Sequence, residues 1–173
     1  CLAGFLDIEG AFDNTSFDAI ESALIEKGLN RKTVNWINSM LSNRNVILSS
    51  NDDKLRMKTV AGCPQGGILI PLLWSMVIDS ALRVLNDNGF TAEGYADDLV
   101  ILVKGKHPKI ISYLMQSGLN LIQRWCTQIG LKINPEKVSM VPFTRKQKID
   151  DQLNTLRLFN KEIGYTCLLY TSP

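Results

Sequence analysis

The first part of the chain mixes a short apolar run with segments in which apolar residues recur every three or four positions. Leu2 to Ile8 is apolar except for Asp7 near its end, which predicts a buried strand. Two amphipathic segments follow. The first has helix-capping residues at 14–16 and closes at Gly28, and the second begins near Asn30. These segments predict two successive helices.

Two pairs of strand-like runs are separated by turn-forming residues, and each pair predicts a β-hairpin. Residues 45–50 and 54–60 form the first pair, and residues 91–95 and 99–103 form the second. The second turn is Ala96-Asp97-Asp98, so two acidic residues stand between apolar strands.

Longer apolar segments lie between and after these hairpins. They predict a helix over about 69–85 and another that begins at Pro108 and ends at Gly130. Further strands are predicted at 137–143 and 156–159. Because strands and helices mix without a regular βα alternation, the predicted class is α+β. Three tryptophans on helical patterns are predicted to pack in the core: Trp36, Trp74 and Trp125.

Composition narrows the function classes only a little. The 173 residues are 45% apolar and carry a net charge of +2, which does not by itself indicate a nucleic-acid-binding protein. Acidic residues outnumber basic ones over 1–103, and basic residues outnumber acidic ones over 104–173. The acidic part could bind metal ions and the basic part phosphates, or the division is a chance distribution of charges over solvated faces. Four scattered cysteines and a single histidine disfavour a zinc site. The apolar runs are too short to span a membrane, and we expect no membrane partner.

Three carboxylates are the strongest candidates for chemistry. Asp7 ends an apolar strand, and Asp97 and Asp98 sit at a tight turn between apolar strands. Acids brought together near a core repel each other, and divalent cations relieve that repulsion. Such a cluster can hold two Mg²⁺ ions that activate an attacking oxygen and stabilise a leaving one. The alternative is ordinary turn chemistry, because Asp is common at turns.

Four segments in order carry a family resemblance. Residues 5–13 (FLDIEGAFD), 62–67 (GCPQGG), 95–98 (YADD) and 130–137 (GLKINPEK) resemble motifs A, B, C and D of reverse transcriptases. The residues of these motifs are similar to those in the polymerases of non-LTR (LINE-type) retrotransposons. Group II intron maturases are related polymerases that share the same palm. The resemblance implies a right-hand polymerase palm, an antiparallel sheet backed by helices, and we expect it to form one partial domain over 1–166.

The resemblance also implies the catalytic roles. Asp7 and Asp97 would be the principal ligands of two Mg²⁺ ions, with Mn²⁺ as a substitute. The backbone carbonyl of Ile8 would be a further ligand, and Asp98 is the least secure of the three acids because side chains alternate along a strand. Lys137 maps onto a lysine that donates a proton to the leaving pyrophosphate, or is simply a solvated lysine.

Four further residues map onto substrate contacts. Phe12 corresponds to the bulky residue that blocks a ribose 2′-OH, unless it is only a core side chain. Gln65 and Gly66 correspond to the loop that meets the incoming nucleotide and the template base. Tyr95 would lie beside the primer end.

The resemblance implies an RNA-directed DNA polymerase that adds dNTPs to a DNA primer on an RNA template during retrotransposition. Because the chain begins with Cys, and the family's fingers and thumb lie outside its motifs, we expect a fragment that is inactive alone. The full protein is expected inside the cell, in cytoplasm and nucleus, and its oligomeric state is not predicted. An inactive or domesticated relic that only folds or binds RNA is the alternative. A remote one is a haloacid-dehalogenase-like phosphatase with Asp7 as nucleophile, which needs alternating βα units.

The last seven residues are a separate case. Residues 167–173 match what the DNA of a transposase-based sequencing adapter encodes. We therefore predict a non-native tail, although a match of six ordinary residues can also arise by chance.

Overall fold

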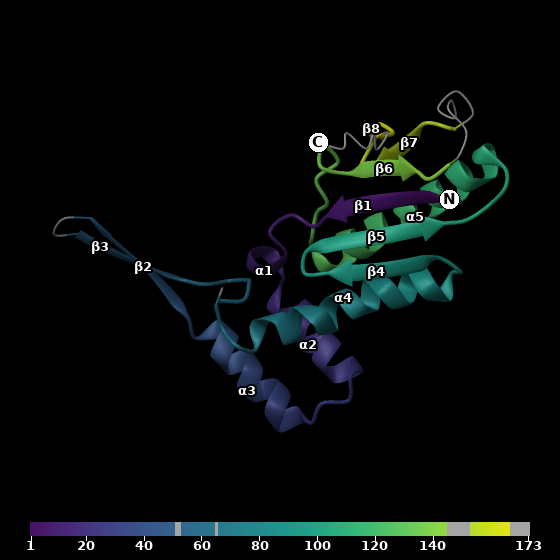
Figure 1. The fold of residues 1–173 in the computed structure, drawn as a ribbon. Helices are drawn as coiled ribbons and strands as arrows, with labels where there is room; N and C mark the ends of the chain where they lie inside the picture. The colour runs from purple at the N-terminus through teal and green to yellow at the C-terminus, as the bar shows by residue number, and fades with distance from the viewer. Residues whose placement is uncertain (51–52, 65, 145–152, 167–173) are drawn as a thin grey trace, which may run out of the picture. The chain divides into compact units, whose positions relative to one another are not determined.

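The computed structural model describes residues 1–50, 53–64, 66–144 and 153–166. These residues form two compact units, one built from 1–9, 81–128 and 132 onward, the other from 10–80 and 129–131. Figure 1 labels the elements in chain order. They are β1 (Leu2–Asp7), α1 (Ala11–Asn14), α2 (Phe17–Glu26), α3 (Arg31–Ser42), β2 (Asn45–Ser50), β3 (Asp53–Lys58), α4 (Ile70–Asp87), β4 (Thr91–Tyr95), β5 (Asp98–Val103), α5 (Pro108–Ile129), β6 (Ser139–Pro142), β7 (Leu156–Leu158) and β8 (Lys161–Ile163).

The first unit is organised around a four-stranded antiparallel sheet. Its strand order is β4-β5-β1-β6, so the strand that comes first in the chain lies inside the sheet (Figure 1). The predicted α+β class and antiparallel sheet are confirmed. The phosphatase alternative required regular βα units feeding a parallel sheet, and this sheet has none.

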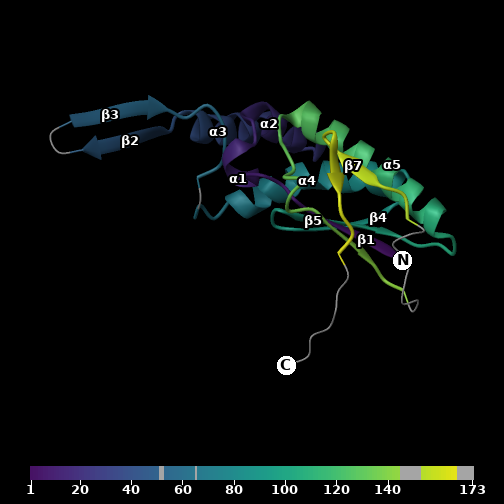
Figure 2. The same cartoon turned by 90° about the horizontal axis from the view of Figure 1, so that it is seen from above.

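Helix α5 covers one face of this sheet, as Figures 1 and 2 show. A Cβ placed on Gly4 of β1 would lie 3.0 Å from Met140 Cε and 3.3 Å from Met115 Sδ, so the missing side chain lets α5 approach the sheet closely. The helix buries an apolar stripe at helical spacing. Its members are Ile111, Met115, Leu119, Ile122, Trp125 and Cys126.

The second unit contains two capped helices and a hairpin. The Ser16 hydroxyl accepts a hydrogen bond from the Ala19 N–H at 3.1 Å, and Asn30 Oδ1 accepts one from the Thr33 N–H at 2.9 Å. These caps satisfy backbone donors that the first turn leaves open. Beyond α3, strands β2 and β3 pair with each other alone among the described residues.

The sequence predictions for the longer elements are confirmed, with three differences. Strand β5 begins at Asp98, so the second hairpin turn has two residues instead of three. The short elements α1 and β8 were not predicted. The expected burial of Trp36 is wrong: its side chain is 59% exposed, because α3 buries Val34, Ile37 and Leu41 on another side, whereas Trp74 and Trp125 are buried as predicted.

Two further expectations concern the ends of the chain and the membrane. The tail at 167–173 lies outside the described residues, and the single domain over 1–166 stays a prediction. Among the residues that the structure describes, no helix is both long and apolar enough to cross a membrane.

Candidate active site

Two of the predicted acids face each other across neighbouring strands. Asp7 ends β1, Asp98 begins β5, and the two are paired in the antiparallel register. Directly opposite residues share a face of the sheet. In β5, Leu99, Ile101 and Val103 are buried and the intervening residues are not, which leaves Asp98 on the less covered face. The alternation that builds the core therefore directs both acids away from it.

The third acid lies at the turn that ends the same strand pair. The Ile8 N–H donates a hydrogen bond to the Asp97 carbonyl at 3.1 Å. This bond makes Ile8 and Asp97 a hydrogen-bonded pair, so Asp7 and Asp98 form the other kind, with Cα atoms about 4.5 Å apart. Like charges directly opposite in such a pair are destabilising. The register thus concentrates negative charge at one end of the sheet.

The tight turn before Asp98 contains a strained residue. Ala96 has φ of 52°, in the left-handed region that residues other than glycine and asparagine seldom adopt. Such a conformation costs on the order of 1–3 kcal/mol and persists only where neighbouring structure enforces it. Sequence reasoning did not find this strain, because alanine gives no turn signal.

Lys137 is brought to the same place by backbone pairing. The Glu9 N–H donates to the Lys132 carbonyl at 2.8 Å, and Ile8 and Ile133 form an antiparallel bridge. The chain then turns so that Lys137 Nζ lies 2.6 Å from Asp7 Oδ2. This oxygen is buried and has no other polar partner among the described residues.

The ammonium of Lys137 is held in its charged form. The hydrogen bond and the charge of Asp7 raise the pKa above the usual lysine value of 10.5 and outweigh desolvation, which lowers it, while the charges of Glu9 and Asp97 add smaller increases. Lys137 therefore stays protonated at neutral pH and senses both Asp7 and Asp97. The motif-D lysine and the motif-A and motif-C acids share one electrostatic environment.

Two predicted substrate residues meet in the second unit. Phe12 and Gly66 line a cavity of about 530 Å³ together with Gly67, Ile70 and Pro71. The Phe12 ring also lies 5.9 Å, centre to centre, from Trp74 with the planes tilted by 52°. The side chain is half-buried, so it packs on a core residue and borders the cavity at the same time.

Close backbone contacts explain why these distant segments meet. The Gly62 N–H donates to the Thr15 carbonyl at 2.8 Å, and the Cys63 N–H donates to the Phe12 carbonyl at 2.6 Å. A Cβ on Gly62 would lie 2.4 Å from the Asp13 carbonyl oxygen, so glycine is required there. The Arg44 guanidinium donates to the Gly62 carbonyl, a tether with no signal in the sequence.

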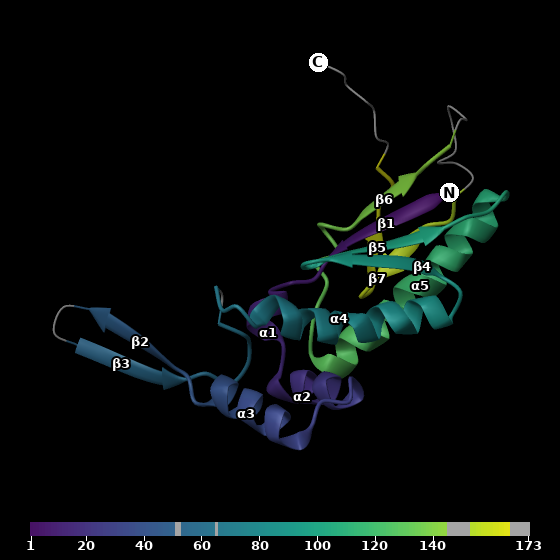
Figure 3. The same ribbon diagram turned by 60° about the horizontal axis from the view of Figure 1, so that its bottom comes forward.

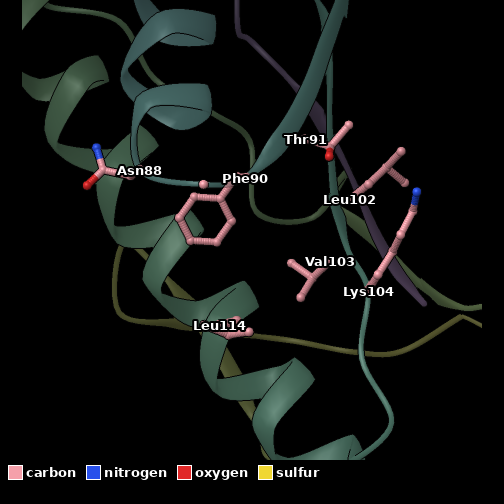
Figure 4. Close-up of a pocket in the computed structure, with 8 residues that line it drawn as sticks. Asn88, Phe90, Thr91, Leu102, Val103, Lys104 and Leu114 are labelled. Carbon is pink, nitrogen blue, oxygen red and sulfur yellow. The ribbon is translucent and has the colours of Figure 1, made fainter.

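The remaining predicted residues divide as follows. Tyr95 is 84% exposed and is paired in register with Asp98. Gln65 lies outside the described residues. A second cavity of about 210 Å³, lined by Phe90, Leu102 and Leu114 among others, contains none of the predicted residues (Figure 4). It borders the opposite end of β4 and β5 from Asp98, so it is not part of the acidic site.

The acids suit a divalent cation chemically. Carboxylate oxygens are the hard donors that Mg²⁺ prefers. Asp7 offers a buried carboxylate oxygen, Oδ2, whose contact is the ammonium of Lys137. Within the described part of the chain, no three His, Cys, Asp or Glu side chains already converge to enclose an ion. The residues present therefore fit the metal by donor type and charge, and Asp7 and Asp97 would hold it.

Comparison with known proteins shows the family of the chain. The family model described as reverse transcriptase (RNA-dependent DNA polymerase) matches residues 1–157. The chain is 30% identical over 129 residues, 75% of its length, to a protein of the type-1 retrotransposable element R1DM of Drosophila melanogaster, of which it covers 12%. It is 31% identical over 156 residues to the R2 element polyprotein of Nasonia vitripennis, covering 83% of the chain and 15% of that protein.

Solved structures agree on the fold. Apo telomerase from Candida tropicalis superposes with a TM-score of 0.59 at 14% identity, over 85% of this chain and 31% of that one. The chain belongs to the reverse transcriptase family, its fold is the family's α+β palm, and its curated relatives come from non-LTR retrotransposons such as R1, R2 and jockey. Reverse transcriptases generally use divalent metal ions. The chain spans 12% to 15% of the length of the two curated relatives described above.

Ala96→Gly should raise the free energy of unfolding by about 1 kcal/mol, because glycine adopts a positive φ without the Cβ clash. Urea unfolding measures the change. Ala23→Gly, in the buried face of α2, is the opposite-sign control and should lower stability by about 1 kcal/mol. Equal losses in both variants would show that Ala96 is not strained.

Lys137→Met should remove a pH-dependent part of the stability in metal-free buffer. A pKa raised by folding adds stability that is present below the usual lysine pKa and lost as pH rises through the folded value. The unfolding free energy of the wild type should therefore fall toward that of the variant as pH rises past 10.5, by a small amount since the side chain is 62% exposed. Lys106→Met, at an exposed lysine, is the control, and a pH-independent difference for Lys137→Met would contradict the prediction.

Proposed function

We propose that this chain is the catalytic palm of a non-LTR retrotransposon reverse transcriptase, whose whole protein extends a DNA primer with dNTPs along an RNA template. The observation that carries the proposal is the register of β1 with β5, which pairs Asp7 with Asp98 and joins Ile8 to Asp97. Relatives named RNA-directed DNA polymerase, from transposon BS and the mobile element jockey of Drosophila melanogaster, support the reaction. A telomerase neighbour solved with a fragment of telomeric RNA supports an RNA partner.

In this proposal Asp7 and Asp97 hold two divalent ions, Mg²⁺ or Mn²⁺, with Asp98 and the Ile8 carbonyl completing the site. Bound ions of this kind lower the pKa of an attacking hydroxyl and neutralise a departing pyrophosphate. The repulsion between Asp7 and Asp98 would favour binding of a cation, because a nearby positive charge offsets it. A role in metal binding would explain why the chain places three acidic side chains at one end of the sheet.

The other residues take the following roles. Lys137 stays protonated beside Asp7 and donates its proton to the leaving pyrophosphate. Phe12 borders the cavity in its own unit and there excludes a ribose 2′-OH, while Gly66 lets the backbone approach the nucleotide. Gln65 reads the nucleotide and template base, and the exposed Tyr95 lies beside the primer end.

A retrotransposon polymerase meets its RNA in the cytoplasm and its DNA target in the nucleus. We place the whole protein in both compartments on this argument.

Mn²⁺ binding tests the acidic site on the chain itself. Asp7→Asn and Asp97→Asn should each weaken Mn²⁺ binding by more than about tenfold, because each removes a charged ligand. Water-proton relaxation or electron paramagnetic resonance measures the affinity. Asp18→Asn, an exposed acid in the first turn of α2, is the matched control and should leave the affinity unchanged. Equal affinity in all four proteins would refute the metal site.

Primer extension tests the relation of the chain to its whole protein. We expect the isolated chain to leave a DNA primer on an RNA template unextended, because it spans only 12% to 15% of the length of the two relatives described above. Mg²⁺-dependent extension that Asp97→Asn abolishes would refute the expected inactivity while supporting the chemistry. Extension that survives this substitution would contradict the proposed catalytic role of Asp97.

A further inference from the structure

The hairpin of β2 and β3 is a two-stranded ribbon with two chemically different faces. Val46 pairs with Met57 and Leu48 with Leu55, so one face is apolar. In the alternate positions Asn45 pairs with Lys58, Ile47 with Arg56 and Ser49 with Lys54. This second face, hereafter the cationic face, thus carries three basic side chains in a row. Figure 3 shows the ribbon extending beyond α3 within its unit.

The cationic face is open to solvent. Lys54, Arg56 and Lys58 are all exposed, and none forms an ion pair with a described side chain. Side chains two positions apart on a strand are separated by about 6.8 Å, so the three charges span about 14 Å. The cross-strand partners of two of them are Asn45 and Ser49, which supply neutral hydrogen-bonding groups. A regular row of exposed cations makes a positive potential that attracts a polyanion.

The base of the ribbon is fixed. The Thr59 N–H donates to the Arg44 carbonyl at 3.1 Å and continues the ladder beyond both strands. The Arg44 side chain donates to the Leu41 carbonyl at 2.9 Å, and to the Gly62 carbonyl as well. Arg44 therefore ties the ribbon to the end of α3 and to the loop that leads to Gly66. A ribbon with this anchor presents its charges from a constrained position.

We propose that the cationic face binds the phosphate backbone of single-stranded RNA, as a contact along the template strand. The proposal rests on the proposed function for the identity of the RNA. Each phosphate of a nucleic-acid strand carries one negative charge, so three cations in a row can each neutralise one phosphate of that strand. The major groove of duplex RNA is too deep and narrow for side chains to read, so the ribbon suits an unpaired strand. Contacts to phosphate make the binding independent of sequence.

The test is RNA binding by the whole chain, measured by fluorescence anisotropy with a labelled uridine homopolymer at several salt concentrations. The variant replaces Lys54, Arg56 and Lys58 with alanine. Each lost phosphate contact on a single strand lowers the slope of log affinity against log salt by about 0.7, so the slope should fall by about 2. At about 0.1 M salt this corresponds to roughly a hundredfold weaker binding.

A matched control removes the same charge from scattered positions. Lys32→Ala, Lys106→Ala and Arg124→Ala combined take three exposed cations from α3, the loop after β5 and α5, and should change the slope little. Circular dichroism of both triple variants checks that each remains folded. A slope and affinity that are unchanged in the ribbon variant, or equally reduced in both variants, would overturn the proposal.

Mn²⁺ binding by the ribbon variant separates this inference from the proposed function. Replacing Lys54, Arg56 and Lys58 with alanine should leave the Mn²⁺ affinity at the wild-type value, since all three lie on β3 and none lies in the strand pair that holds the acids. Loss of RNA binding without loss of Mn²⁺ binding supports both ideas. If the chain binds RNA through the ribbon but binds no Mn²⁺, the proposed polymerase site is refuted and the proposed RNA contact is retained.

Discussion

The antiparallel pairing of β1 with β5 is the constraint on which the candidate site depends. It joins residues more than ninety positions apart in sequence and sets Asp7 opposite Asp98. Because side chains alternate along a strand, a shift of one residue would turn Asp98 toward the core and Leu99 toward solvent. The buried leucine and isoleucine residues of β5 therefore fix the position of the acid as firmly as any polar contact does.

The same end of the sheet concentrates features that work against stability. Like charges face each other at Asp7 and Asp98, and Ala96 holds a left-handed conformation next to them. Lys137 offsets part of the charge through its contact with Asp7. Strain and uncompensated charge at one place are typical of a site shaped for binding rather than for folding, and a divalent cation would relieve the charge.

In the second unit, too, contacts between segments distant in sequence position the candidate site residues. Backbone hydrogen bonds from Gly62 and Cys63 hold the loop against the segment that contains Phe12, and Arg44 ties that loop to the ribbon. The loop at Gly62 and Cys63 thereby connects the cavity beside Phe12 to the cationic face of the ribbon. Under the proposed roles of Gly66 and the cationic face, this link joins a nucleotide contact to an RNA contact.

The sequence by itself determined the longer helices, the two predicted hairpins and the identity of the candidate acids, because these follow from local periodicity, capping residues and short motifs. It could not decide that Asp98 rather than Asp97 pairs with Asp7, that Lys137 reaches Asp7, or that Arg44 tethers Gly62. It also misplaced Trp36, since a helical pattern does not say which side of the helix meets a neighbour. These outcomes depend on register and packing between segments far apart in the chain, and only the tertiary structure fixes such pairings.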